Sequence, residues 1–418
     1  QAHPARPQPP HSPDLMGIQR RARRRASWQP AALADGLRRQ PATTKELLDG
    51  AGRGGRLAFG VAAMQGWREE MEDAHLALPD FDLQGGLSLF GVFDGHGGSA
   101  VASVVAERLP AVLRGLPSYQ QGRHEEALRE AYMRLDEFLG SPAGRKELRR
   151  RAPGEMPEGM GSTAVVALVK GGNEPELLVA NAGDSRCVLV SGSTAIAMSK
   201  DHSPRLPAEL HRIKQAGGFV NCEGRVNGNL NLSRALGDFF YKRNHKLKPE
   251  EQMITAMPDV RRRRLGGDDR YLVLGCDGIW ERTSNQGVVD ILLAHLAYQG
   301  RKKPTLSRAC ARFLDANLSK NPVRTQGLGC DNMTLALVDL RSTQAGPRPR
   351  APVGPAGSNG SMCDATPCVP IAPLLEGQAT ARPSPAARRR QQTYAWLCSS
   401  QRRRVVLLRH RTALKLLH

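Results

Sequence analysis

The sequence lacks a regular cysteine pattern and any long apolar run. Its eight cysteines are scattered and form no Cys-x-x-Cys pair, which argues against a disulfide framework and a structural zinc site. No stretch approaches the ~18 apolar residues of a membrane span, and residues 1–56 contain no apolar core of a secretory signal. We therefore expect reduced thiols, no integral membrane segment, and a cytoplasmic or nuclear location.

Aromatic residues are also scarce, at 5%, and acidic residues are outnumbered 60 to 40 by Lys and Arg. The excess of positive charge lies at the two ends. Residues 1–56 hold 11 basic and 4 acidic side chains, residues 341–418 hold 13 and 2, and residues 57–340 hold 36 and 34. Because the centre is nearly neutral and the ends carry few aromatics for base stacking, nucleic acid is not expected as a partner of the central domain.

Both ends are rich in Pro, Gly and Arg and show little periodicity. We expect a disordered basic N-terminal arm over residues 1–56 and a disordered, basic, low-complexity tail over residues 341–418. The arginine-rich run 20–25 suits nuclear import or an anionic membrane surface, and a plain solvated charge run is the alternative. One folded domain is expected over residues 57–340.

Apolar runs of strand length alternate with helical periods in this domain. The expected strands are Leu57–Met64, Leu87–Phe93, Thr163–Val169, Glu176–Asn181, Ser185–Val190, Tyr271–Cys276 and Met333–Leu340. The expected helices are Ser99–Leu116, Glu125–Leu139, Pro207–Ala216, Gln286–Tyr298 and Leu306–Leu318. Strands in close succession, joined by turns with Gly and Asn, favour antiparallel pairing, so the predicted fold class is α+β with two central antiparallel sheets and helices outside them.

Carboxylates recur where these apolar runs begin or end. Burying them without partners costs several kcal/mol each, and a cluster of them repels itself. Hard divalent cations such as Mg²⁺ or Mn²⁺ relieve both problems. Turn formation alone explains any single Asp-Gly or Asp-Asn pair. It is a poorer explanation for the recurrence of carboxylates at several strand ends. These carboxylates are Glu72, Asp73, Asp94, Asp277 and Asp331.

Eight motifs resemble, in order, those of the metal-dependent serine/threonine protein phosphatases of type 2C, and the variants are similar to the animal alpha/beta-like branch. They are Gly66-Trp-Arg-Glu-Glu-Met-Glu-Asp-Ala-His75, Val92-Phe-Asp-Gly-His-Gly-Gly98, Gly161-Ser-Thr-Ala164, Ala180-Asn-Ala-Gly-Asp-Ser-Arg186, Lys200-Asp-His-Ser-Pro204, Leu232-Ser-Arg-Ala-Leu-Gly-Asp238, Cys276-Asp-Gly-Ile-Trp280 and Asp331-Asn-Met-Thr334. The resemblance implies a four-layer α-β-β-α sandwich. It also implies two Mg²⁺ or Mn²⁺ ions at one end of that sandwich.

The resemblance implies a function and a set of ligands as well. Phosphoserine and phosphothreonine in phosphoproteins would be hydrolysed by a hydroxide that bridges the two ions, without a phosphoenzyme. Asp94 would bridge both ions, and the backbone carbonyl of Gly95 would hold one of them, since glycine allows close approach. The implied ligands, direct or through water, are Glu72, Asp73, Asp94, Gly95, Asp277 and Asp331.

Two further residues would act on the substrate. Arg68 would grip the phosphate oxygens with its planar fork, although a surface ion pair with Glu69 or Glu70 is the plainer interpretation of its sequence context. His96 would donate a proton to the departing alkoxide, with a structural histidine as the alternative.

The sequence departs from the family in two places. Relatives hold a weaker third metal with a carboxylate equivalent to Asp184 and a second Asp, where this chain has Glu281. Relatives of the alpha type also carry a helical region after the catalytic domain, which is replaced here by the basic tail. A catalytically weak pseudophosphatase or regulatory module on the same fold is therefore the alternative function. We expect the active protein to be a monomer.

Overall fold

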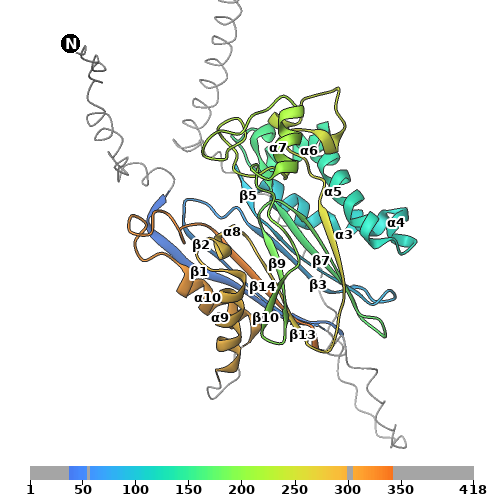
Figure 1. Ribbon diagram of the computed structural model, residues 1–418, viewed down its shortest axis with the longest axis vertical. Helices are drawn as coiled ribbons and strands as arrows, with labels where there is room; N and C mark the ends of the chain where they lie inside the picture. Colours follow the sequence, from blue (N-terminus) through green and yellow to red (C-terminus); the bar gives the residue numbers. More distant parts are fainter. Residues whose placement is uncertain (1–36, 54–56, 299–304, 342–418) are drawn as a thin grey trace, which may run out of the picture.

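The computed structural model describes residues 37–53, 57–298 and 305–341 (Figure 1). The predictions made for residues 1–36 and for the tail after Arg341, including the arginine-rich run 20–25, lie outside these residues. Among the described residues, no helix combines the length and apolar character needed to cross a membrane. Each described cysteine is a free thiol, as expected.

Two antiparallel sheets form the centre of the domain (Figure 1). The six-stranded sheet has the order β1 (Leu37–Ala51), β2 (Ala58–Arg68), β14 (Met333–Asp339), β13 (Asp269–Gly275), β9 (Arg186–Ser191) and β10 (Thr194–Ala197). The five-stranded sheet has the order β12 (Asp259–Arg264), β8 (Glu176–Ala182), β7 (Ala164–Lys170), β4 (Leu87–Phe93) and β3 (Ala74–Asp82). A small third sheet joins β11 (Leu236–Gly237), β6 (Gly161–Ser162) and β5 (Gly95–His96).

Helices cover the outer face of each large sheet. On the five-stranded sheet lie α3 (Ala100–Gly115) and α5 (His124–Gly140), with α4 (Pro117–Gln120) and α6 (Pro142–Arg151) packed against these two helices. On the six-stranded sheet lie α8 (Asp277–Trp280), α9 (Asn285–Ala297) and α10 (Leu306–Asn317). A lobe between β10 and β12 contains α7 (Pro207–Gln215) and short 3-10 turns at Phe239–Tyr241 and Pro249–Glu251; another such turn is Pro157–Gly159. The predicted α+β sandwich of four layers is confirmed.

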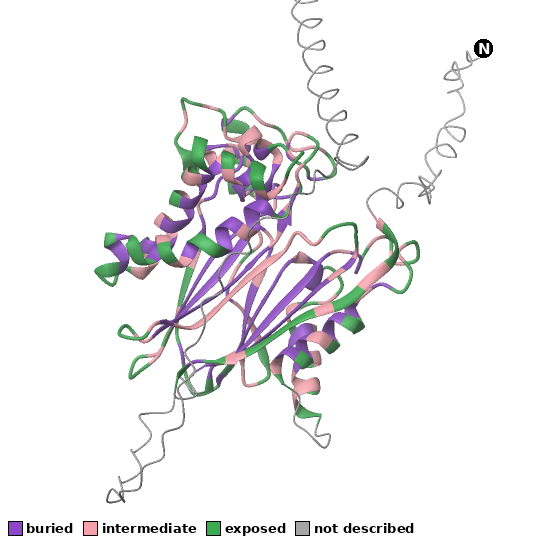
Figure 2. Ribbon diagram, turned by 180° about the vertical axis from the view of Figure 1, so that it is seen from behind, coloured by how far each residue is buried: buried purple, intermediate pink, exposed green. Residues whose placement is uncertain are grey.

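The central strands are buried on both faces, because each lies between the facing sheet and a helical layer. All seven residues of β4 are buried, and so are six of seven in β14. Figure 2 shows this as a continuous purple interior along both sheets. Such strands appear in a sequence as unbroken apolar runs rather than as alternating ones, which is why the apolar runs located them correctly.

Strand β1 corrects the predicted domain boundary. The prediction of a disordered arm is wrong for Leu37–Ala51, which pairs with β2 along its length as an edge strand. Most of its side chains are exposed, so it lacks the apolar pattern that marks a strand. Distant partners hold it instead: Lys45 lies 2.6 Å from Asp315, and the Ser307 amide donates to Asp49 at 2.9 Å. The folded domain therefore begins near residue 37.

A buried carboxylate holds the lobe between β10 and β12 together. Glu209 on α7 accepts hydrogen bonds from Arg212, Ser233 and Arg234, each at 2.7 Å. Burial alone would raise the pKa of Glu209, but the hydrogen bond from Arg234 and the charges of both arginines lower that pKa to about 2. The lobe therefore depends on a compensated, buried ionic network.

Glu209→Ala is expected to lower the free energy of unfolding by about 3 kcal/mol, because it removes the buried carboxylate that two partly buried guanidinium groups share. Urea unfolding followed by circular dichroism measures this. Glu223→Ala, which removes an exposed carboxylate in the same lobe, serves as the control and should leave the midpoint unchanged. Equal midpoints for both variants would contradict the role given to Glu209.

Candidate metal centre and active site

The predicted carboxylates meet at one end of the sandwich. Asp94 follows β4, Asp277 follows β13 as the first residue of α8, and Asp331 precedes β14. In Figure 1, α8 and β5 mark this end. The three side chains line a pocket of about 310 Å³ whose wall is completed by Arg68, Glu69, Glu70, Glu72, Gly95, His96, Thr163, Asp184, Leu230, Asn231, Leu232 and Asn332. Every predicted site residue except Asp73 and Glu281 lines it.

Two groups of side chains in this region have the spacing of metal ligands. Ligand atoms of Asp277, Glu281 and Asp331 lie within 4.8 Å of one another, and so do those of Asp73, Asp94 and Cys276. The two groups adjoin, because the Asp277 amide lies 3.5 Å from Oδ2 of Asp94. The structure therefore brings these carboxylates together at one pocket, and their roles as metal ligands stay a prediction.

Asp73 lies beneath the pocket. Its Oδ2 accepts a hydrogen bond from the Thr334 hydroxyl at 2.7 Å, whereas its buried Oδ1 has no hydrogen-bond partner. Burial, together with neighbouring carboxylates, raises the pKa of Asp73 to about 7. A buried carboxylate oxygen without a partner is expensive, and a cation next to it would supply that partner.

The negative charges of the carboxylates at the pocket repel one another, which disfavours their ionised forms. Burial and then the neighbouring acids raise the pKa of Asp94 and of Asp277 well above the usual range. Burial and Asp201 raise the pKa of Asp184 to about 6. Closely spaced carboxylates of this kind, all offering oxygen ligands, fit Mg²⁺ or Mn²⁺. The donor set and the unpartnered Asp73 oxygen thus agree with the implied metal centre.

Glu281 belongs to this region but not beside its predicted partner. Its ligand atom groups with Asp277 and Asp331, a group that does not include Asp184. One oxygen of Glu281 also accepts a hydrogen bond from the Gly329 amide at 3.0 Å. This hydrogen bond directs the Glu281 carboxylate toward the loop that precedes β14.

Asn332 was not given a role from the sequence, yet it organises the loop that follows β2. Its side-chain amide donates to the carbonyls of Gln65 and Glu70 at 2.9 and 3.0 Å, and its Oδ1 accepts from the Glu72 amide at 2.9 Å. These bonds fix the loop that begins directly after Arg68, the last residue of β2, whose guanidinium lies 2.5 Å from Asp331. Only the distant pairing of β2 with β14 brings these residues together.

The backbone of Gly95 lies close to the backbone of Glu72. A Cβ added there would lie 2.4 Å from the Glu72 carbonyl oxygen, so no side chain fits. Glycine is therefore needed here for close packing against the acidic loop, and the approach of the Gly95 carbonyl to a metal ion stays a prediction.

His96 also has a partner that the sequence argument did not assign. Its Nε2 lies 2.8 Å from Oδ2 of Asp238, a carboxylate that is 3% exposed. Burial alone would lower the pKa of His96, but Asp238 outweighs it and the pKa is raised. Asp238 is the last residue of the sixth motif, so the sequence marked it as a family residue. Nothing in the neighbouring sequence indicates that its partner is His96.

A cysteine and an arginine near the pocket have the spacing Cys-x₅-Arg of the cysteine-dependent phosphatase loop: Cys276 and Arg282. The Cys276 thiol is fully buried, and burial with the charges of Asp73 and Asp94 raises its pKa well above the usual range. Arg282 hydrogen-bonds to the carbonyl of Asn317 instead of facing a phosphate. A thiol held protonated is a poor nucleophile, so this pair does not form a cysteine phosphatase site.

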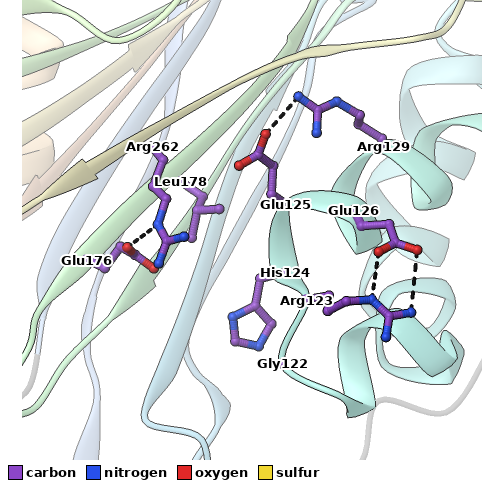
Figure 3. Close-up of a pocket in the computed structure, with 9 residues that line it drawn as sticks. All are labelled: Gly122, Arg123, His124, Glu125, Glu126, Arg129, Glu176, Leu178 and Arg262. Carbon is purple, nitrogen blue, oxygen red and sulfur yellow. Dashed lines mark hydrogen bonds and ion pairs between the residues drawn. The ribbon is translucent and has the colours of Figure 1, made fainter.

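A second pocket, of about 260 Å³, lies at the start of α5 (Figure 3). Figure 3 shows its charges paired: Glu125 with Arg129, Glu126 with Arg123, and Glu176 with Arg262. Opposite charges compensate one another there, whereas the carboxylates of the first pocket repel. The first pocket is therefore the candidate active site.

Comparison with known proteins agrees with this assignment. The family model for Protein phosphatase 2C matches residues 57–323. Protein phosphatase 2C 1 of Paramecium tetraurelia is 44% identical over 291 residues, covering 69% of this chain and 94% of that protein. Probable protein phosphatase 2C 58 of Oryza sativa subsp. japonica is 40% identical over 334 residues, covering 71% and 87%.

A solved structure is similar as well. The crystal structure of a phosphatase from a pathogenic strain of Toxoplasma gondii aligns with a TM-score of 0.58 at 26% identity, over 72% of this chain and 96% of that one. The fold, the acidic pocket and these similarities agree with one another. The chain belongs to the protein phosphatase 2C family of metal-dependent protein phosphatases.

Proposed function

We propose that this phosphatase hydrolyses phosphoserine and phosphothreonine in proteins at a centre of two Mg²⁺ or Mn²⁺ ions. The observation that carries the proposal is the convergence of Asp94, Asp277 and Asp331 on one pocket, where their mutual repulsion calls for cations. When bound, the ions would lower the pKa of water and neutralise charge on the phosphoryl group.

The chain itself would hold and orient these ions. Asp94 belongs to one group of candidate ligands and adjoins the other through the Asp277 amide, so it would serve both ions, while Asp277 and Asp331 would serve one of them. The Gly95 carbonyl and Glu72 would contribute on the other side, and Asp73 would support the centre from beneath. Asp184 and Glu281 do not fall in one ligand group, and each is a candidate ligand of a weaker third ion.

Arg68 would bind the phosphate oxygens. It lines the pocket, and its side chain is 51% exposed, so it is accessible to a substrate. In the structure its guanidinium pairs with Asp331, so it lies beside one of the candidate metal ligands. An arginine fork matches two phosphate oxygens at once, which a lysine cannot do.

Arg68→Ala is expected to lower kcat/KM on a phosphothreonine peptide by about 10–100-fold, mostly through KM, since a charge-assisted hydrogen bond contributes roughly 1.5–3 kcal/mol. Arg68→Lys should recover only part of this loss. Steady-state kinetics with Lys170→Ala as the matched control measure the effect; Lys170 is an exposed cation at the end of β7. An unchanged KM for Arg68→Ala would assign the side chain to a surface ion pair.

His96 would supply the proton that the departing serine or threonine alkoxide needs. It lines the pocket beside Gly95, and its contact with Asp238 favours the protonated ring. A phenolate leaving group such as p-nitrophenolate needs no such proton. His96→Gln should therefore slow hydrolysis of a phosphothreonine peptide more than hydrolysis of p-nitrophenyl phosphate.

Manganese-dependent hydrolysis of a phosphothreonine peptide by the full chain tests the proposed function. Turnover that rises with added Mn²⁺ and disappears with a chelator is the expected result. Folded protein with no turnover at saturating Mn²⁺ or Mg²⁺ would favour the alternative, a pseudophosphatase or regulatory module on this fold.

The proposal also includes the oligomeric state, the cellular location and the branch of the family. The phosphatase would act as a monomer on phosphoprotein substrates. It would do so in the cytoplasm or the nucleus, which suits the free thiols of the five cysteines that the structure describes. Placement in the animal alpha/beta-like branch rests on the motif variants. The relatives reported above come from a ciliate and a plant, so that placement stays a prediction.

A further inference from the structure

The small sheet of β11, β6 and β5 brings together two residues that lie far apart in the sequence. His96 is the last residue of β5, and Asp238 directly follows β11. Strand β6 lies between these strands: Gly161 pairs with His96 on one side and with Gly237 on the other. The result is the contact of 2.8 Å between Nε2 of His96 and Oδ2 of Asp238. The sheet thus delivers a buried carboxylate to the imidazole that faces the pocket.

The contact between His96 and Asp238 requires a residue without a side chain at position 161. A Cβ added to Gly161 would lie 2.3 Å from Oδ2 of Asp238 and 2.4 Å from Nε2 of His96. Both are shorter than any contact that a carbon atom tolerates, so a side chain at this position would push the two groups apart. The backbone beneath the pair is therefore shaped around the hydrogen bond between them.

The backbone of Asp238 is held in an unfavourable conformation. Its φ of 54° lies in the left-handed region, which costs energy for a residue other than glycine. The Asp238 amide donates to the Met160 carbonyl at 2.8 Å. Strain of this kind persists only where the surroundings enforce it.

Those surroundings are built around another buried carboxylate. Asp136 on α5 accepts hydrogen bonds from the Gly237 amide at 2.8 Å and from the Lys242 ammonium at 2.7 Å. Lys242 also donates to the Ala235 carbonyl at 2.9 Å. The chain on both sides of Asp238 is thereby anchored to α5, which fixes where its carboxylate points.

We propose that Asp238 is a positioning residue for the hydrolysis, acting through His96. By accepting a hydrogen bond from the Nε2–H group, Asp238 fixes the orientation of the ring and leaves Nδ1 as the nitrogen that delivers a proton to the leaving oxygen. The proton moves from Nδ1 to the alkoxide as the phosphorus–oxygen bond breaks, and the Asp238 carboxylate remains ionised. The inference rests on the proposed function, in which His96 is the proton donor.

A double-mutant cycle tests this inference. Asp238→Asn is expected to reduce kcat on a phosphothreonine peptide by about tenfold or more, since proton transfer by a positioned group contributes typically 10²–10⁴-fold. On p-nitrophenyl phosphate, which needs no proton, the loss should stay within about threefold. Combined with His96→Gln, the substitution should cost nothing further, because its effect passes through the imidazole.

Gly161→Ala provides an independent variant. Its methyl group should separate the pair and reproduce the same selective loss on the phosphothreonine peptide. Asp268→Asn, in an exposed turn, is the matched control, and thermal melting with Mn²⁺ shows that each variant is folded.

Nuclear magnetic resonance of protein labelled with ¹⁵N in histidine gives a readout that does not need turnover. The wild type should show a downfield Nε2 proton that His96→Gln removes and Asp238→Asn shifts upfield, whereas neither variant should change the signal of His202, whose Nε2 lies 3.2 Å from Asp259. Wild-type rates for Asp238→Asn on the phosphothreonine peptide would overturn the inference while leaving the proposed function intact, and so would equal losses on both substrates. An inactive wild type with the resonance present would instead overturn the proposed function.

Discussion

Asp94→Ala is expected to lower kcat/KM on a phosphothreonine peptide by at least about 10³-fold, because a metal ion contributes several kcal/mol of charge stabilisation and each ~1.4 kcal/mol is tenfold in rate. Asp94 lies where the two groups of candidate ligands adjoin. Removal of its carboxylate should therefore lower the affinity for both ions, whereas removal of a ligand of one ion should lower the affinity for that ion alone. Asp277→Ala should also abolish turnover, since it leaves one ion without its principal carboxylate.

Steady-state kinetics over a Mn²⁺ titration measure this effect. Asp268→Ala removes an exposed aspartate from the turn before β13 and should retain wild-type rates. The same Asp94 variant should melt at a higher temperature than the wild type in the presence of a chelator, because it relieves repulsion among buried carboxylates. An Asp94→Ala protein that keeps even a tenth of wild-type activity would contradict its place at the centre.

The metal-free protein is expected to lose about 2–4 kcal/mol of stability as the pH rises from about 5 to 8. Burial raises the folded-state pKa of Asp73 from 3.8 to about 7 and that of Asp184 to about 6. A carboxyl group with a raised folded pKa favours folding fully below its unfolded pKa, and this stability is lost as the pH rises through the folded value. Glu209, with its pKa lowered to about 2, loses its stabilising effect only at much lower pH.

Urea unfolding in a chelator at several pH values measures this loss, and saturating Mn²⁺ should abolish it. The matched variant is Asp73→Asn, which removes the titrating carboxyl and should flatten the profile of the metal-free protein. Stability of the metal-free wild type that is constant or rises over this range would show that the acidic cluster is not strained.

Strands buried on both faces could be predicted from the sequence, and edge strands could not. Leu87–Phe93 is an unbroken apolar run because a sheet and a helical layer both cover it. The edge strand β12 contains four consecutive arginines, and the edge strand β1 is mostly exposed. Their strand conformation depends on pairing with β8 and β2, which no local pattern reveals.

The same distinction applies to the site. Asp94 and Asp277 each follow an apolar strand and precede a glycine, so local sequence identifies them. The roles of Asn332 and Asp238 depend on partners about 260 and 142 positions away, at Glu72 and His96. Only the register of the sheets brings those partners together, so their motifs could be recognised without their contacts being predicted.

Anomalous diffraction at the manganese edge, from crystals grown with Mn²⁺, tests the central claim most directly. The account predicts two peaks in the pocket, about 3.5–4 Å apart, both within coordination distance of the Asp94 carboxylate and one also adjoining Asp277 and Asp331. A well-ordered pocket without manganese, or manganese bound only elsewhere on the protein, would contradict it.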